Sequence, residues 1–178
     1  MLKQSDIAPD FKVKDIFEKE VSLSKDGKYT YLSFHRFATC PFCVLRTREL
    51  IKAYPRFEEH QIAIVSIWPS SKSNMLQYIG SENAPFPMIA DENKIIFQKY
   101  HVVKSSMLSV FKMLVEPMKI YQALKGRYKK MVIDADPNLL PAEFLISPAG
   151  EIVLAYYGKH FGDHLDLETI FKHTLPEN

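Results

Sequence analysis

The sequence lacks a surplus of charge of either sign, since 23 Lys and Arg residues face 21 Asp and Glu residues and the formal net charge is +2. A balance this mild does not predict a nucleic-acid partner. The chain also lacks an apolar run of about 18 nearly uncharged residues, the length that a membrane span needs. Its first residues are polar, unlike the apolar centre of a secretory signal. We therefore expect a soluble, cytoplasmic protein with no nucleic-acid and no membrane partner.

Cysteine is scarce, with two residues in a chain of 178, and this scarcity excludes a disulfide framework. The two are close together, as Cys40 and Cys43. In a reducing compartment such a pair is more often catalytic or metal-binding than structural. Internal repeats and low-complexity tracts are lacking too. The length and a hydrophobic content of 47% suit one globular domain over residues 1–178.

Segments with strand and helix patterns alternate along the chain. Apolar and β-branched runs bounded by turn residues predict an N-terminal hairpin over 8–13 and 21–23, and strands over 29–37, 61–68, 85–89, 142–146 and 151–157. Apolar residues at helical spacing predict helices over 41–54, 70–79, 91–100 and 165–173. The alternation predicts an α/β layer structure, and the late hairpin requires a mixed sheet. The expected fold is thioredoxin-like, with a mixed central sheet and helices on both faces.

The cysteine pair lies where the strand that ends near Phe37 turns into a helix that begins at Pro41. Side chains three positions apart are neighbours on one helix face, close enough for a disulfide after a small adjustment. The positive end of the helix dipole and the unpaired N–H groups favour a thiolate at Cys40. We expect Cys40 to be the accessible nucleophile, and Cys43, one turn inside, to be the shielded resolving thiol.

Polar and charged residues surround this pair in the sequence. Thr39 supplies either a helix cap or a hydroxyl for the substrate, and the cap is the favoured interpretation. Positive charge nearby comes from four side chains, those of His35, Arg36, Arg46 and Arg48. Arg36 and Arg46 are the candidates for a supporting arginine at the reactive sulfur.

A zinc site is the alternative interpretation of the cysteine pair, with His160 and His164 as further ligands. The two halves are far apart in sequence, so nothing local would assemble the site. Surface or capping roles are favoured for both histidines. We expect no metal and no organic cofactor.

Pro141 precedes the predicted strand over 142–146, a position that suits a residue without an N–H group. In a thioredoxin-like fold this position packs a cis-proline beside the cysteine pair, where backbone groups are exposed for pairing with substrate. We therefore predict a cis peptide bond before Pro141.

Four segments together resemble the peroxiredoxin family of the alkyl hydroperoxide reductase and thiol-specific antioxidant type, in its branch with a Cys-x-x-Cys motif. They are Ala8–Phe11, Tyr31–Arg36, Cys40–Cys43 and Leu140–Ile152, and the similarity spans nearly the whole chain. The resemblance implies a thioredoxin fold, an antioxidant peroxidase activity, Cys40 in the peroxidatic position and Cys43 as a local resolving cysteine. It also implies a thioredoxin-like or low-molecular-weight thiol as reductant.

Two positions depart from the pattern of typical peroxiredoxins. Pro and Thr stand seven and three residues before the peroxidatic cysteine in the family, whereas this chain has Ser33 and Phe37 there. The sequence therefore leaves three alternatives open. These are a thiol-dependent peroxidase, a thiol–disulfide oxidoreductase without peroxidase activity, and a non-enzymatic thioredoxin-fold binding module.

An apolar segment over 105–125 forms a predicted helical excursion before the last hairpin. Only a narrow polar stripe interrupts its apolar surface, so it needs a partner to cover it. Packing on its own domain is the favoured interpretation, and a homodimer or partner surface is the alternative. The basic run over 125–130 that follows is interpreted as a solvated loop.

Overall fold

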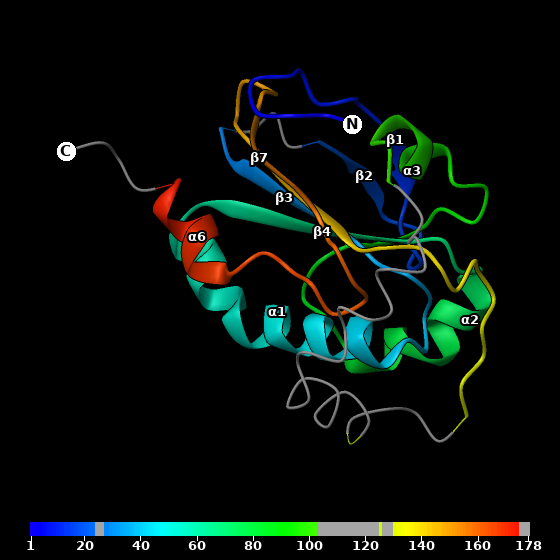
Figure 1. Ribbon diagram of the computed structural model, residues 1–178. Helices are drawn as coiled ribbons and strands as arrows, with labels where there is room; N and C mark the ends of the chain where they lie inside the picture. Colours follow the sequence, from blue (N-terminus) through cyan, green and yellow to red (C-terminus); the bar gives the residue numbers. More distant parts are fainter. Residues whose placement is uncertain (24–26, 103–124, 126–129, 175–178) are drawn as a thin grey trace.

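The computed structural model describes residues 1–23, 27–102, 125 and 130–174 (Figure 1). The first two strands pair as a small antiparallel sheet, and the other five form a mixed sheet in the order β5–β4–β3–β6–β7. The strands are β1 (Lys12–Lys14), β2 (Glu20–Ser22), β3 (Tyr29–Phe34), β4 (Ile62–Trp68), β5 (Met88–Ala90), β6 (Ala142–Ile146) and β7 (Ile152–Tyr157). The helices are α1 (Pro41–Glu59), α2 (Lys72–Gln77), η1 (Ile79–Glu82), α3 (Ile95–Lys99) and α6 (Leu167–Lys172). The predicted α/β, thioredoxin-like fold with a mixed sheet is confirmed.

The register of the central strand brings distant parts of the chain to one end of the sheet. β3 runs parallel to β4 and antiparallel to β6, and Phe34 pairs with Ile67 on one side and with Ala142 on the other. The loop that leaves β3 toward the cysteines therefore begins beside the start of β6. This places Pro141 next to the segment that carries the Cys-x-x-Cys motif.

Side chains alternate between the two faces of the sheet, as the strand period of two requires. Tyr31 on β3 packs with Leu50 and Phe57 of α1 and with Phe171 of α6. Leu32, its neighbour, packs on the other face in the cluster that includes the side chains of α3 and of the N-terminal hairpin. Helices α1 and α6 thus cover one face, while α3 and the β1–β2 hairpin cover the other (Figure 1).

Helix α1 is longer than the sequence predicts. It continues through Pro55 to Glu59, whereas the prediction ended it at residue 54. A proline inside a helix removes one backbone hydrogen bond. The fully buried side chain of Phe57, beyond the proline, holds the last turns against the sheet.

Strand β3 is shorter than predicted, because it ends at Phe34 rather than at Phe37. Residues 35–39 leave the sheet to reach the start of α1. The hydroxyl of Ser70 accepts a hydrogen bond from the Ala38 N–H at 2.8 Å and donates to Asp134 at 2.8 Å. Side chains distant in sequence therefore fix the path of this loop.

Two helices begin later than the sequence predicts, α2 at Lys72 rather than at 70 and α3 at Ile95 rather than at 91. Ser71 accepts a hydrogen bond from the Asn74 N–H at the start of α2. The carboxylate of Asp91 accepts from three backbone N–H groups at the start of α3, those of Ile95, Ile96 and Phe97. Within the described ranges, no helix is long and apolar enough to cross a lipid bilayer. The predicted excursion over 105–125 lies outside the described residues apart from Lys125.

Candidate active site

The two cysteines lie at the start of α1, on the layer of apolar side chains between the sheet and α2. Cys40 is the residue before the helix, with extended backbone, and Pro41 is the first helical residue. Cys43 lies in the first turn, and both thiols are free. Both residues are 0% exposed. The expected accessibility of Cys40 is therefore wrong, because side chains and backbone from later segments cover it.

Arg36 is the basic residue that reaches the sulfur atoms. Its Nη1 donates to Cys40 Sγ at 3.3 Å, and its backbone N–H donates to Cys43 Sγ at 3.3 Å. The same guanidinium donates from Nε to the carbonyl of Leu139 at 2.9 Å and from Nη2 to the carbonyl of Pro137. Its carbon Cζ lies 3.6 Å from the ring centroid of Phe161. One side chain thus joins the cysteine pair to two segments that lie far along the chain.

These contacts give the two thiols opposite properties. Burial alone would raise the pKa of Cys40, but the hydrogen bond from the Cys43 thiol, the Arg36 charge, and the N–H groups of Phe42 and Cys43 lower it to about 6. Burial raises the pKa of Cys43 well above its ordinary value, and the neighbouring Cys40 thiolate raises it further. At neutral pH the pair consists of a thiolate at Cys40 and a thiol at Cys43.

The ionisation of Cys40 gives a direct test of the arginine contact. Replacing Arg36 with Met should move the pKa of Cys40 from about 6 toward the ordinary thiol value of about 8.5, because the neighbouring positive charge is removed. The ultraviolet absorbance of the thiolate, titrated against a Cys40→Ser background, measures the midpoint. The matched control is Arg48→Met, since Arg48 is an arginine close to the cysteines on α1 but pairs with Glu82 at 2.7 Å. An unchanged midpoint in Arg36→Met would contradict the assignment.

Thr39 does not cap the helix, so the favoured interpretation of this residue is wrong. Its hydroxyl donates to the Val132 carbonyl at 2.7 Å and accepts from the Val132 N–H at 3.0 Å. Cys40 is the residue that precedes the helix, and no side chain caps the helix there. The hydroxyl therefore both donates to and accepts from the backbone of Val132, so Thr39 holds the segment around Val132 against the cysteine loop.

Pro141 lies where the sequence places it, at the start of β6, but its peptide bond is trans. The described residues contain no cis peptide bond, so the predicted cis-proline is wrong. A trans X–Pro bond is the lower-energy form by about 0.5–1 kcal/mol. The position needs no N–H group, and its carbonyl accepts a hydrogen bond from the Gly158 N–H at 2.9 Å. A trans proline therefore fits this position, because no N–H group is needed there and the carbonyl has its hydrogen-bond partner.

Arg46 contacts neither cysteine sulfur, contrary to its proposed supporting role. Its guanidinium bonds the carboxylate of Glu143, with Nε to Oε1 at 2.9 Å. His164 Nδ1 lies 3.0 Å from the same oxygen, and Arg46 also donates to the Tyr31 hydroxyl at 2.8 Å. Burial alone would raise the pKa of Glu143, but Arg46 and His164 hold it well below its ordinary value. The network is a buried ion pair under the sheet, one turn of α1 beyond the cysteines.

Sequence reasoning missed Glu143 and Phe161, and it misplaced the histidines. Glu143 was the one detectable case, because a charged residue stands inside an otherwise apolar strand. His160 is buried, and the side chain of His164 is 10% exposed, so the expected surface positions are wrong. In the part of the chain that the structure describes, no three His, Cys, Asp or Glu side chains come together as a metal site.

The fold and the cysteine motif at the start of α1 define a thioredoxin-fold protein, and comparison with known proteins narrows this class. Residues 5–155 match the AhpC/TSA family. The chain belongs to that family and is a thiol-dependent oxidoreductase of the peroxiredoxin-like type. A sequence search of curated proteins found no match.

Solved structures show the same fold at low sequence identity. Peroxidoxin BcpB from Mycobacterium tuberculosis is 13% identical with a TM-score of 0.71, and the match covers 98% of this chain and 97% of that one. The thioredoxin domain of a thiol-disulfide oxidoreductase from Bacteroides vulgatus is 19% identical with a TM-score of 0.62, covering 98% and 100%. Peroxiredoxin Q from Xanthomonas campestris is 14% identical with a TM-score of 0.64, covering 92% and 89%. At these identities the likeness concerns the fold.

Proposed function

We propose that the protein is a thiol–disulfide oxidoreductase in which Cys40 attacks a substrate disulfide and Cys43 resolves the product. The observation that carries the proposal is the contact of Arg36 Nη1 with Cys40 Sγ at 3.3 Å. The contact favours the thiolate at Cys40, while the raised pKa of Cys43 keeps that thiol protonated until it is needed. A nucleophile and a resolving group are thereby distinguished within one motif.

The reaction proceeds in two exchanges. The Cys40 thiolate attacks one sulfur of the substrate disulfide, the substrate S–S bond breaks, and the other substrate sulfur leaves as a thiolate that takes up a proton. Cys43 then loses its proton and attacks Cys40 Sγ, which releases the second substrate thiol. The enzyme now carries a Cys40–Cys43 disulfide, and the substrate has gained two electrons and two protons. A thioredoxin-like or low-molecular-weight dithiol returns the enzyme to its reduced form.

The residues next to the sulfur do not reproduce the peroxide-binding pattern of typical peroxiredoxins. The position three residues before Cys40 holds the buried side chain of Phe37, which has no hydroxyl. The Thr39 hydroxyl is engaged in both directions by Val132. Neither residue offers a peroxide oxygen the hydrogen bond that the typical family pattern supplies.

Peroxide reduction is a second candidate, because the chain belongs to the AhpC/TSA family and Arg36 places N–H donors at the reactive sulfur. In that reaction the Cys40 thiolate attacks one peroxide oxygen and the O–O bond breaks. Cys40 becomes a sulfenic acid and the other oxygen leaves as water or an alcohol. Cys43 then condenses with the sulfenic acid, and water is released as the disulfide forms.

Two assays on one preparation separate these candidates. We expect rapid reduction of insulin disulfides by the reduced protein, with a dithiol as the source of electrons. We expect peroxide consumption, coupled to a thioredoxin system, to be close to that of the Cys40→Ser control. Fast peroxide consumption together with slow insulin reduction would reverse the order of the two candidates. Slow rates in both assays, equal to the control, would contradict both.

A further inference from the structure

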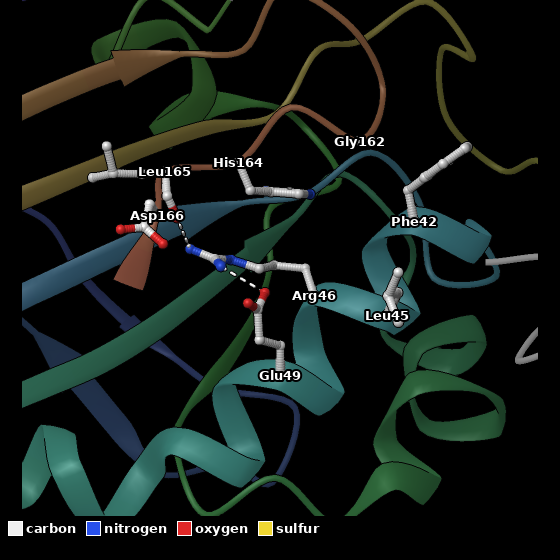
Figure 2. Close-up of a pocket in the computed structure, with 8 residues that line it drawn as sticks. All are labelled: Phe42, Leu45, Arg46, Glu49, Gly162, His164, Leu165 and Asp166. Atoms are coloured by element: carbon white, nitrogen blue, oxygen red, sulfur yellow. Dashed lines mark hydrogen bonds and ion pairs between the residues drawn. The ribbon is translucent and has the colours of Figure 1, made fainter. Parts of the chain in front are cut away.

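A cavity of about 400 Å³ lies beside the cysteine motif, between the first turns of α1 and the segment that leads into α6 (Figure 2). Phe42, Leu45 and Leu165 form its apolar part. Phe42 stands between the two cysteines and packs against the apolar cluster that contains both of them. A molecule bound in the cavity would therefore contact Phe42, the side chain at the middle of the cysteine motif.

Among the residues that the structure describes, Arg46 is the one side chain of fixed positive charge at this cavity, and it is already paired with protein groups. All three nitrogens of the Arg46 guanidinium donate hydrogen bonds to protein acceptors. Nη1 donates to Glu49 at 2.7 Å, Nε to Glu143 at 2.9 Å, and Nη2 to the carbonyl of Leu165 at 2.8 Å. Figure 2 shows the guanidinium directed at Glu49 and at the Leu165 backbone. Arg46 leaves little attraction for an anionic ligand.

The remaining polar groups at the cavity are hydrogen-bond acceptors. Glu49 has a side chain that is half exposed, and Asp166 is exposed at the start of α6. The third is His164. Its Nδ1 lies 3.0 Å from Glu143 Oε1 and must donate to it, and in the tautomer that carries its proton on Nδ1 the Nε2 atom is an acceptor. Within the described part of the chain, this buried Nε2 has no hydrogen-bond partner.

We propose that this cavity binds a lysine or arginine side chain next to the disulfide of a protein substrate, an inference that rests on the proposed disulfide exchange. The aliphatic stem of such a side chain lies along Phe42 and Leu45, as long basic side chains do on apolar surfaces. Its cationic head donates to Glu49 and Asp166, and an N–H that reaches His164 Nε2 supplies the partner that this atom lacks. Acidic side chains are disfavoured by the same carboxylates.

Single-turnover exchange with three short peptides tests the proposal. Each peptide carries one cysteine as a mixed disulfide with thionitrobenzoate, and they differ at two flanking positions, which are both Lys, both Met or both Glu. Met matches the unbranched lysine stem without its charge. The rate constant for thionitrobenzoate release is divided by that of the same peptide with free dithiothreitol, which removes differences in intrinsic reactivity.

We expect the normalised rate constant to be about fivefold higher for the Lys peptide than for the Met peptide, and lower again for the Glu peptide. The preference should largely vanish at about 1 M salt, where the Debye length is about 3 Å. It should also vanish in the double variant Glu49→Gln, Asp166→Asn, in which Asn retains the helix-capping ability of Asp. The double variant Glu58→Gln, Glu59→Gln, an equal change of charge at the far end of α1, should retain it.

Two outcomes overturn the proposal while exchange itself proceeds. One is a rate constant that differs less than twofold among the three peptides. The other is a lysine preference that survives in the double variant. If no peptide reacts faster than with Cys40→Ser, the disulfide-exchange function fails instead. Binding of the Lys peptide with Ser in place of its cysteine then decides the proposal: NMR shifts of the Leu45 and Leu165 amides support it, and unchanged amides overturn it.

Discussion

Replacing Cys40 with Ser should abolish turnover, whereas replacing Cys43 with Ser should trap the substrate on Cys40. Cys40 holds the stabilised thiolate beside Arg36, so it makes the first attack, and the one other cysteine in the sequence, Cys43, has a raised pKa and does not replace it. Without the Cys43 thiol the second exchange cannot occur, so the mixed disulfide accumulates. Mass spectrometry after one equivalent of substrate disulfide reads the result as the added mass of one substrate thiol.

The wild-type protein is the control, and it should lose two hydrogens and retain no added group. The Cys40→Ser variant should remain unmodified under the same conditions. If wild type forms no Cys40–Cys43 disulfide, the two roles are wrong. They are equally wrong if the Cys43→Ser variant resists modification as completely as Cys40→Ser does.

The fold and the place of the cysteine motif could be predicted from sequence, because both depend on local patterns. The apolar run at 61–68 and the turn residues at 147–150 fix β4 and the last hairpin without reference to distant parts of the chain. A strand followed by Pro41 fixes the start of α1. Two of the boundaries that failed, those at Phe34 and Pro55, are decided by side chains from other elements.

The surroundings of the sulfur atoms could not be predicted, because distant segments build them. Four basic residues stand near the motif in sequence, and only the path of the loop over 35–39 decides that Arg36 turns toward the thiols. That path depends on Ser70 and Asp134, while Val132 binds the Thr39 hydroxyl and Phe161 stacks on the Arg36 guanidinium. None of these residues carries a signal that links it to the motif.

Arg46 shows how a local argument assigns a residue to the wrong site. Its position on α1, two turns from Cys40, made it a candidate for the sulfur. It pairs instead with the carboxylate of Glu143 on the strand Ala142–Ile146, at 2.9 Å. A charge inside a buried strand requires an opposite charge, so Glu143 was the feature from which this pair could have been inferred.

Removing the Glu143 carboxylate should produce the largest loss of stability among the single substitutions considered. Glu143 is 1% exposed and Arg46 is 2% exposed at the side chain, so Glu143→Ala leaves a buried guanidinium without its main partner. Breaking such a pair costs about 3–5 kcal/mol of unfolding free energy. Urea denaturation at neutral pH measures the loss. The matched control is Glu168→Ala, which breaks the exposed pair with Arg56 and should cost far less.

Acidification should remove the difference between wild type and Glu143→Ala. Arg46 and His164 hold the pKa of Glu143 well below its ordinary value of about 4.3 in the folded protein. A carboxylate with a lowered folded pKa stabilises the fold fully above its unfolded pKa, and the contribution declines as the pH falls toward the folded value. The stability gap should therefore be constant from neutral pH down to about 5 and narrow below about 4. A gap that widens on acidification would show that Glu143 is protonated in the fold, which would contradict the ion pair.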